Sequence, residues 1–193
     1  MARVAAILLL TLGLSACSLM SAQDDKARLL EFQRLYMKQG LACDAPYFAM
    51  FKATASGERV DGSAAASNAA KVCKDAASLL ASFGKLPGSH GSNQSPVEHP
   101  CVLSLTAASQ AAQQAITLID GDMRPSLKAN FRSLVDDRNR YLKACEADLA
   151  TRAKTLKIPQ SELENIAKQE RLAAAGFEGQ QELNVQEGAR RAH

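Results

Sequence analysis

The sequence has 193 residues, with 23 Lys and Arg against 20 Asp and Glu, so the formal net charge is +3 with both signs interspersed. This near balance argues against a nucleic-acid-binding protein, which would carry a basic face. Trp is absent and aromatic residues make up only 5% of the chain, which leaves few side chains to stack on sugars or bases. Alanine-rich segments with few β-branched residues favour an all-α fold.

The first sixteen residues have the pattern of an export signal. Arg3 is the lone charge ahead of an apolar run that ends at Leu14, and the small residues Ser15 and Ala16 follow it. The apolar run is too short to cross about 30 Å of hydrocarbon as a permanent span. These features predict a signal peptide over residues 1–16, whose removal would leave 177 residues with a formal charge of +2.

The segment Leu14-Ser15-Ala16-Cys17 resembles the lipobox of bacterial lipoproteins, and this resemblance covers residues 1–18 only. It implies a diacylglyceryl thioether on the Cys17 sulfur, cleavage before this residue, and a further acyl chain such as palmitate on the new amino terminus. Two or three acyl chains hold a protein firmly at a bilayer. By the sorting pattern of the family, Ser18 implies the outer membrane, facing the periplasm. The alternative is an ordinary secretory signal with an incidental cysteine.

Four further cysteines lie in the exported part: Cys43, Cys73, Cys101 and Cys145. In an oxidising compartment an even number of cysteines favours two disulfides. A metal site is the alternative, but no two of them have C-x-x-C spacing. The midpoints between the first two and between the last two fall in turn-like stretches, 56–59 and 120–125. Residues equidistant from a hairpin turn lie side by side, which predicts Cys43–Cys73 and Cys101–Cys145.

Residues 17–23 are expected to be a lipidated tether, and residues 24–39 the first helix of the body. Its apolar residues fall at helical spacing on one stripe. They are Leu29, Phe32, Leu35 and Tyr36. Gly40 is expected to end this helix.

A second, shorter helix is expected after Asp44, which can cap it, with Pro46 in its first turn. It carries the densest aromatic cluster of the chain: Tyr47, Phe48, Met50 and Phe51. We interpret this cluster as core packing. The alternative is an apolar groove for a partner or an acyl chain.

A third helix is expected over residues 63–83. Residues 84–100 are rich in Gly, Ser and Pro, which predicts a flexible linker between a hairpin at 41–83 and a second hairpin at 101–157. His90 and His99 lie in this linker, and we expect both to be exposed to solvent rather than to act as ligands.

The second hairpin is predicted to consist of helices over residues 101–119 and 125–156. The apolar stripe of the longer helix has near-heptad spacing, and both Arg138 and Cys145 fall on it. We expect Arg138 to extend its charged end to solvent or to pair with an acidic neighbour, such as Asp137 or a residue of another helix. A functional contact with an anion is the alternative.

A last helix is expected over residues 161–176, with Ser161 and Glu164 at capping-box spacing and Gly176 at its end. The remaining residues, 176–193, are predicted to be a disordered tail. The prediction is therefore a bundle of disulfide-stapled antiparallel helical hairpins over residues 24–175.

Function is less well indicated, because the sequence contains no G-x-S-x-G, no H-E-x-x-H and no phosphate-binding glycine loop. Adjacent Asp136 and Asp137 point in different directions on a helix, so we expect salt bridges with Arg140 or Lys143 rather than an acid/base pair. We expect no enzyme, no metal, no nucleic acid, and no cofactor besides the acyl groups on Cys17.

The function that we expect is that of a non-catalytic outer-membrane lipoprotein that binds another envelope protein or acts in envelope assembly. Two alternatives stay open. One is an inhibitor or immunity protein against an envelope-active hydrolase or toxin, and the other is a carrier of lipid or another apolar ligand.

Overall fold

The computed structural model describes the backbone of residues 2–56, 59–87, 95–121 and 124–191. Side chains are described for residues 23–53, 61–87, 95–121 and 124–176. These parts of the chain contain helices and no strand, which confirms the all-α prediction. The elements are α1 (Ala2–Ser56), α2 (Arg59–Ala81), the short 3-10 helix η1 (Pro96–Glu98), α3 (Pro100–Ile119), α4 (Pro125–Thr155) and α5 (Gln160–Arg191).

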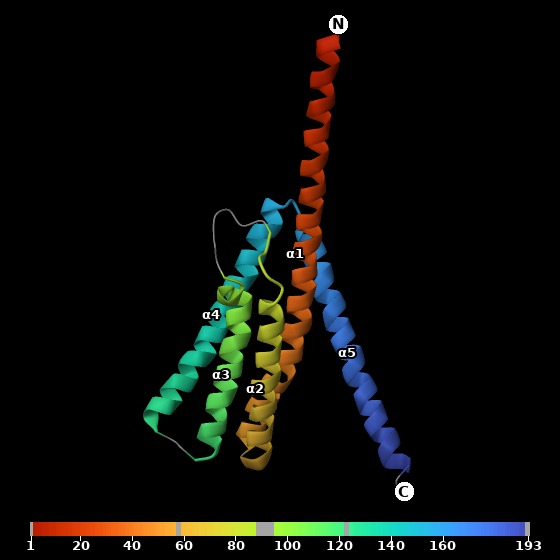
Figure 1. The fold of residues 1–193 in the computed structure, drawn as a ribbon. Coiled ribbons are helices and arrows are strands. Elements are labelled where there is room, and N and C mark those ends of the chain that lie inside the picture. Colours follow the sequence, from red (N-terminus) through yellow and green to blue (C-terminus); the bar gives the residue numbers. More distant parts are fainter. Residues whose placement is uncertain (1, 57–58, 88–94, 122–123, 192–193) are drawn as a thin grey trace.

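The helices pack in chain order. Helix α2 lies between α1 and α3, α3 packs on α4, and α5 packs on the far side of α1 (Figure 1). All five α-helices contribute to one continuous core, from Leu29 on α1 to Leu163 on α5. The two predicted hairpins therefore share a single core rather than forming two units.

Small side chains bring α2 and α3 together. Both helices bury alanines: Ala66, Ala69, Ala70, Ala76 and Ala77 on α2, and Ala107, Ala108, Ala111, Ala112 and Ala115 on α3. The hydroxyl of Ser109 donates to the backbone oxygen of Ala70 at 2.7 Å, which is possible only because the two backbones approach closely. Each alanine removes little apolar area from water, so each contributes only modestly to the hydrophobic stabilisation.

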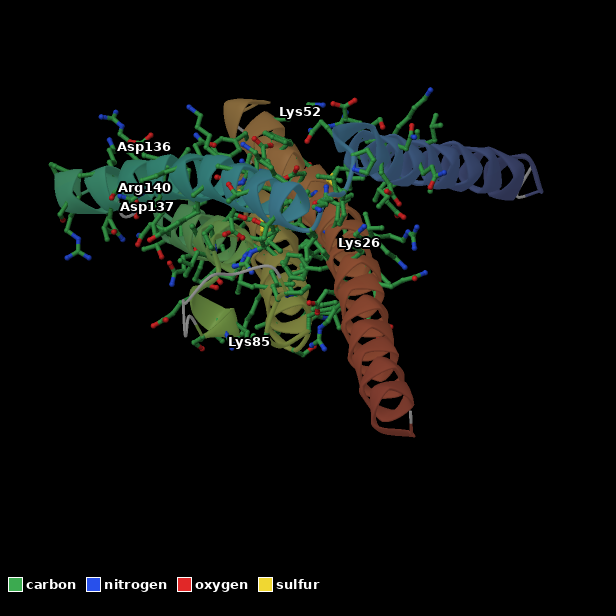
Figure 2. The ribbon with its side chains drawn as sticks, turned by 90° about the horizontal axis from the view of Figure 1, so that it is seen from above. Lys26, Lys52, Lys85, Asp136, Asp137 and Arg140 are labelled. Atoms are coloured by element: carbon green, nitrogen blue, oxygen red, sulfur yellow. A yellow bond between two sulfur atoms is a disulfide. The ribbon has the colours of Figure 1, made fainter. Side chains whose placement is uncertain are left out.

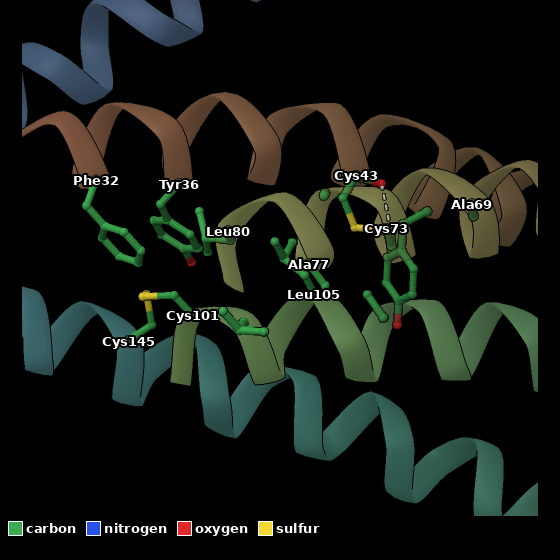
Figure 3. Close-up of a cluster of buried hydrophobic side chains, with 14 of the residues drawn as sticks. Phe32, Tyr36, Cys43, Ala69, Cys73, Ala77, Leu80, Cys101, Leu105 and Cys145 are labelled. Atoms are coloured by element: carbon green, nitrogen blue, oxygen red, sulfur yellow. Dashed lines mark hydrogen bonds between the residues drawn. A yellow bond between two sulfur atoms is a disulfide. The ribbon is translucent and has the colours of Figure 1, made fainter. Parts of the chain in front are cut away.

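Both predicted disulfides are present (Figure 3). Cys43–Cys73 joins α1 to α2 and Cys101–Cys145 joins α3 to α4, each with its Cα atoms 4.7 Å apart. All four cysteines are completely buried. Each disulfide therefore fixes the packing of one pair of antiparallel helices from inside the core.

Helix α1 is continuous, so the predicted end at Gly40 and the predicted new helix after Asp44 are wrong. Gly40 lies within α1, and Pro46 is an internal residue of the same helix. Glycine costs about 1 kcal/mol and proline about 3 kcal/mol inside a helix. Burial of one stripe across the whole segment outweighs these local costs, because a break would remove half of it from the core. The stripe comprises Leu29, Phe32, Tyr36, Cys43, Tyr47 and Met50.

The predicted signal peptide (1–16) and tether (17–23) form the first part of α1, which projects beyond the bundle in Figure 1. The tether is thus helical. Side chains before Gln23 lie outside the described part, and the lipobox with Cys17 stays a prediction. Among the described residues, no helix is both long enough and apolar enough to cross a membrane.

The predicted linker, residues 84–100, is fastened to the bundle at both of its ends. Leu86 is buried, and the guanidinium of Arg152 donates to the backbone oxygens of Leu86 and Pro87 at 3.3 and 3.0 Å. His99 is 6% exposed, so the prediction of a solvent-exposed side chain is wrong for this residue. His90 lies outside the described residues.

Helix α5 begins at Gln160, which places the predicted cap Ser161 inside it, and it continues to Arg191. The predicted end at Gly176 and the predicted disordered tail over 176–193 are therefore wrong as far as Arg191. Helix α5 contains three glycines, Gly176, Gly179 and Gly188, and each costs about 1 kcal/mol relative to alanine. Alanines before Gly176 and Glu, Gln and Leu after it favour helix strongly enough to continue across it.

Candidate functional site

A groove of about 550 Å³ lies between α1, α4 and α5. Helices α4 and α5 diverge from their junction toward opposite sides of α1 (Figure 1), which leaves the groove along α1. Its apolar lining comes from all three helices: Met37 and Leu41 from α1, Leu142 and Leu149 from α4, and Leu163 and Ala167 from α5. This lining can accept an apolar surface from a ligand or partner.

Gln33 is the unusual polar residue of this groove. It lines the groove, it is only 8% exposed, and its Oε1 atom is buried without a hydrogen-bond partner. Leaving a buried acceptor unpaired costs about 1–3 kcal/mol. The oxygen is closed to solvent in the free protein, so the carboxamide gains this free energy when its side chain turns toward a donor in the groove.

Tyr36 also lines the groove, but its hydroxyl is already engaged by the side chain of Ser104 on α3. Burial raises the pKa of Tyr36 to about 12, and the hydrogen bond with Ser104 opposes that rise in part. The phenol therefore stays neutral, and its ring lies between α1 and α3 (Figure 3).

Carboxylates outnumber cations around the groove. Its charged lining residues are Asp44, Glu146, Glu164 and Arg171. Asp44 is neutralised by a salt bridge to Arg138. Glu146 and Glu164 are exposed, and neither forms an ion pair with any side chain that the structure describes. Two helices thus present free carboxylates to the same groove.

A second polar cluster joins α3, α4 and the 84–100 segment. His99 Nε2 lies 2.9 Å from Asp148 Oδ2, and Arg152 Nε lies 2.5 Å from the same oxygen. His99 Nδ1 accepts from the backbone N–H of Cys101 at the start of α3, so the ring proton is on Nε2 and is donated to Asp148. Both ring nitrogens are occupied, which leaves no lone pair to act as a general base.

The electrostatics of this cluster favour an ionised Asp148. Burial alone would raise the pKa of its carboxyl, but hydrogen bonds from His99 and Arg152, together with their charges, hold it below its usual value. The cluster therefore acts as a structural connection, because it caps α3 and fastens Leu86 and Pro87 to α4.

The predicted aromatic cluster is divided between core and surface. Tyr47 and Met50 are buried as predicted, whereas Phe48 and Phe51 are 53% and 36% exposed. The guanidinium of Arg138 lies 4.7 Å from the ring centre of Tyr47. Tyr47 falls on the stripe of α1 that faces the core, and the two exposed rings fall on the neighbouring stripe.

The predicted ion pairs of α4 are confirmed in two cases. Arg138 pairs with Asp44 of another helix, which is one of the predicted options. Asp137 accepts from Arg140 at 2.7 Å, one turn away on the same helix (Figure 2). Asp136 is exposed and lies apart from this pair.

Gln33 and the groove were not predicted from the sequence. A signal was present, because Gln33 lies four residues after Leu29 and three before Tyr36, at a buried position of a stripe that is otherwise apolar.

In the described part of the chain, no three His, Cys, Asp or Glu side chains converge to hold a metal ion. No family model matches the chain, and no curated protein or solved structure shows detectable similarity to it.

Proposed function

We propose that this chain is a non-catalytic lipoprotein, held at the outer membrane by acyl groups on Cys17, whose helical body binds another protein of the cell envelope. The lipobox resemblance at Leu14-Ser15-Ala16-Cys17 supports the anchor. The two disulfides suit an oxidising compartment such as the periplasm.

The groove between α1, α4 and α5 is the observation that carries the binding function. It combines an apolar lining with the unpaired carboxamide oxygen of Gln33. Exposed apolar surface and an unpaired buried oxygen each lower the stability of the free protein. A partner that covers the lining removes the first cost, and a turn of the Gln33 side chain toward a donor of that partner removes the second. Apolar grooves between helices are a common docking site for a helix of another protein.

The two alternatives differ in what they require of this groove. An inhibitor or immunity protein would use it, or another face, to cover a hydrolase or toxin. A carrier of fatty acids would need to accept a carboxylate beside Glu146 and Glu164, which is unfavourable because the charges have the same sign. The groove therefore supports a protein partner over an anionic lipid.

Site-specific photo-crosslinking in the native host tests this function. A photoreactive phenylalanine derivative replaces Leu142, which lines the groove, and in a matched control it replaces Leu79, an exposed residue of α2. We expect a discrete adduct with an envelope protein from position 142 and none from position 79. Equal labelling from both positions, or no adduct from Leu142, Leu41 or Ala167, would contradict the proposal.

The anchor is tested separately by Cys17→Ser. We expect the wild-type chain to fractionate with the outer membrane and to incorporate labelled palmitate, and the variant to lose both properties. An unlabelled wild-type chain that stays in the soluble fraction would exclude the lipoprotein.

A further inference from the structure

The groove between α1, α4 and α5 presents hydrogen-bond acceptors from each of its three helices. Helix α1 contributes the buried, unpaired Oε1 of Gln33, α4 contributes the carboxylate of Glu146, and α5 contributes that of Glu164. Glu146 also acts electrostatically on the phenol of Tyr36, which faces the same groove. Arg171 is the one cation among the residues that line it. The charged groups of the groove are thus mostly acceptors, while the side-chain amides of Gln33 and Gln160 supply both acceptors and donors.

An acceptor-rich site selects for groups that donate hydrogen bonds and accept none. Among protein side chains these are the ammonium of Lys and the guanidinium of Arg. Both groups are positively charged and can pair with Glu146 and Glu164, which have no cationic partner among the described side chains. Both side chains also have a long apolar part that can lie along Leu142 or Leu163. We infer, on the basis of the proposed function, that the occupant is an amphipathic helix of a partner protein with Lys or Arg beside its apolar stripe.

The dimensions of the groove favour a helix over a small amine. Its lining runs from Gln33 to Asp44 on α1 and from Gln160 to Arg171 on α5, which is about 16 Å on each at 1.5 Å per residue. This length corresponds to about three helical turns. A helix with apolar residues at i, i+3, i+4 and i+7 covers such a floor, whereas a small amine would leave most of it exposed to water.

The negative charge of Glu146 and Glu164 favours a basic helix over an acidic helix or a fatty acid. An acidic helix or a fatty acid would bring carboxylates close to Glu146 and Glu164, and like charges at close range repel. Neither can donate to Gln33 from its carboxylate. The basic helix satisfies the apolar lining, the two free charges and the unpaired oxygen together.

Binding of three synthetic peptides tests the inference. The first is a helix of about four turns with Leu at i, i+3, i+4 and i+7 and Lys on both flanks of that stripe. The second carries Glu in place of every Lys, and the third has the composition of the first in scrambled order. The lipidated full-length protein is held in phosphatidylcholine nanodiscs, and binding to empty discs is subtracted. Fluorescence anisotropy of the labelled peptides gives the dissociation constants.

We expect the Lys peptide to bind, with an affinity that falls as salt is added, and the Glu and scrambled peptides to bind at least about tenfold more weakly. The double variant Glu146→Gln/Glu164→Gln should weaken the Lys peptide by about tenfold. The matched variant Glu31→Gln/Asp75→Asn removes two exposed carboxylates away from the groove and should leave the affinity unchanged.

Gln33→Leu separates binding from folding. This substitution removes an oxygen that is unpaired in the free protein, so we expect stability against urea to stay the same or rise while binding weakens about three- to tenfold. A residue with only a structural role would change stability and leave binding intact.

Equal binding of the Lys and Glu peptides, or undiminished binding to the Glu146→Gln/Glu164→Gln variant, would overturn the inference. If no peptide binds while the crosslink from Leu142 persists in the native host, the basic helix is excluded and the proposed function stands. If the crosslink is absent and the Lys peptide still binds through Glu146 and Glu164, the groove has the inferred chemistry and the proposed envelope partner is excluded.

Discussion

His99 donates from Nε2 to the carboxylate of Asp148 at 2.9 Å, which ties the residue before α3 to the last third of α4. The same imidazole caps α3 through Nδ1, and the same carboxylate receives Arg152. Arg152 in turn holds the backbone of Leu86 and Pro87. One cluster therefore fixes the start of α3, the register of α4 and the segment that follows α2.

Acid should weaken the fold through Asp148. Its pKa is depressed in the folded protein, so its contribution to stability is present above the unfolded pKa of about 3.9 and is lost as the pH falls through the folded value. We expect Asp148→Asn to lower the free energy of unfolding at neutral pH, and the difference from wild type to shrink below about pH 4. Urea unfolding over this range measures it. Asp75→Asn on the surface of α2 is the control, and parallel curves for Asp148→Asn and wild type would contradict the expectation.

The two roles of His99 can be separated by substitution. His99→Leu keeps an apolar group beside Phe32 but loses both the cap and the bond to Asp148, and we expect it to cost about 1–3 kcal/mol of unfolding free energy. His99→Asn keeps an acceptor for the N–H of Cys101 and should lose less. Urea midpoints compare the two, and equal losses would mean that the cap contributes nothing.

Alkaline unfolding should depend on Tyr36. Its pKa rises from 10 to about 12 on folding, so the neutral phenol stabilises the fold below about pH 10, and this contribution is lost between about pH 10 and 12. The shift corresponds to about 2–3 kcal/mol. We expect Tyr36→Phe to show a smaller loss of stability over this interval than wild type, as measured by urea unfolding and by phenolate absorbance.

Pro46 should lower the stability of α1, because a proline inside a helix has no backbone N–H to donate. Pro46→Ala restores a backbone donor inside the helix, and we expect it to raise the unfolding free energy by about 1–3 kcal/mol. Pro125 occupies the first turn of α4, where no such donor is needed, so Pro125→Ala should have little effect. Thermal and urea unfolding test this pair. A destabilised Pro46→Ala variant would show that the ring makes necessary packing contacts.

Each disulfide should stabilise the fold separately. The bridges close loops of 30 and 44 residues, and removal of either pair by double Cys→Ala substitution should cost about 3–4 kcal/mol. Urea unfolding of the Cys43→Ala/Cys73→Ala and Cys101→Ala/Cys145→Ala variants measures this. Peptide mapping without reductant should recover only the two sequential pairs, and a Cys73–Cys101 peptide would contradict the hairpin arrangement.

The disulfide pairing was predictable because it depends on symmetry within each hairpin. Cys43 and Cys73 lie at similar distances from one turn, and Cys101 and Cys145 at similar distances from the other, so sequence spacing alone brings them together. The bounds of α3 and α4 were predictable for a related reason, since their apolar periodicity and their end signals agree.

The errors arose where local signals disagree with burial elsewhere in the molecule. Gly40 and Pro46 favour a break, but the stripe from Leu29 to Met50 packs on α2 and keeps α1 intact. His99 lies in a segment with the composition of a flexible loop, and its partner Asp148 is 49 residues away in sequence. The groove escaped prediction because its lining is drawn from three helices that no sequence periodicity relates to one another.

Because α1 is one continuous helix, it connects the predicted point of lipid attachment directly to the groove. Gln33 follows Cys17 by sixteen residues within a single helix, which places it about 24 Å along the axis from the predicted point of lipid attachment. With acyl groups on that cysteine, the tilt of α1 would set the distance of the groove from the bilayer and the direction in which the groove opens. A shorter or hinged connection would let a partner approach from any side. The rigid α1 helix would instead restrict recognition to proteins that reach the same distance from the membrane.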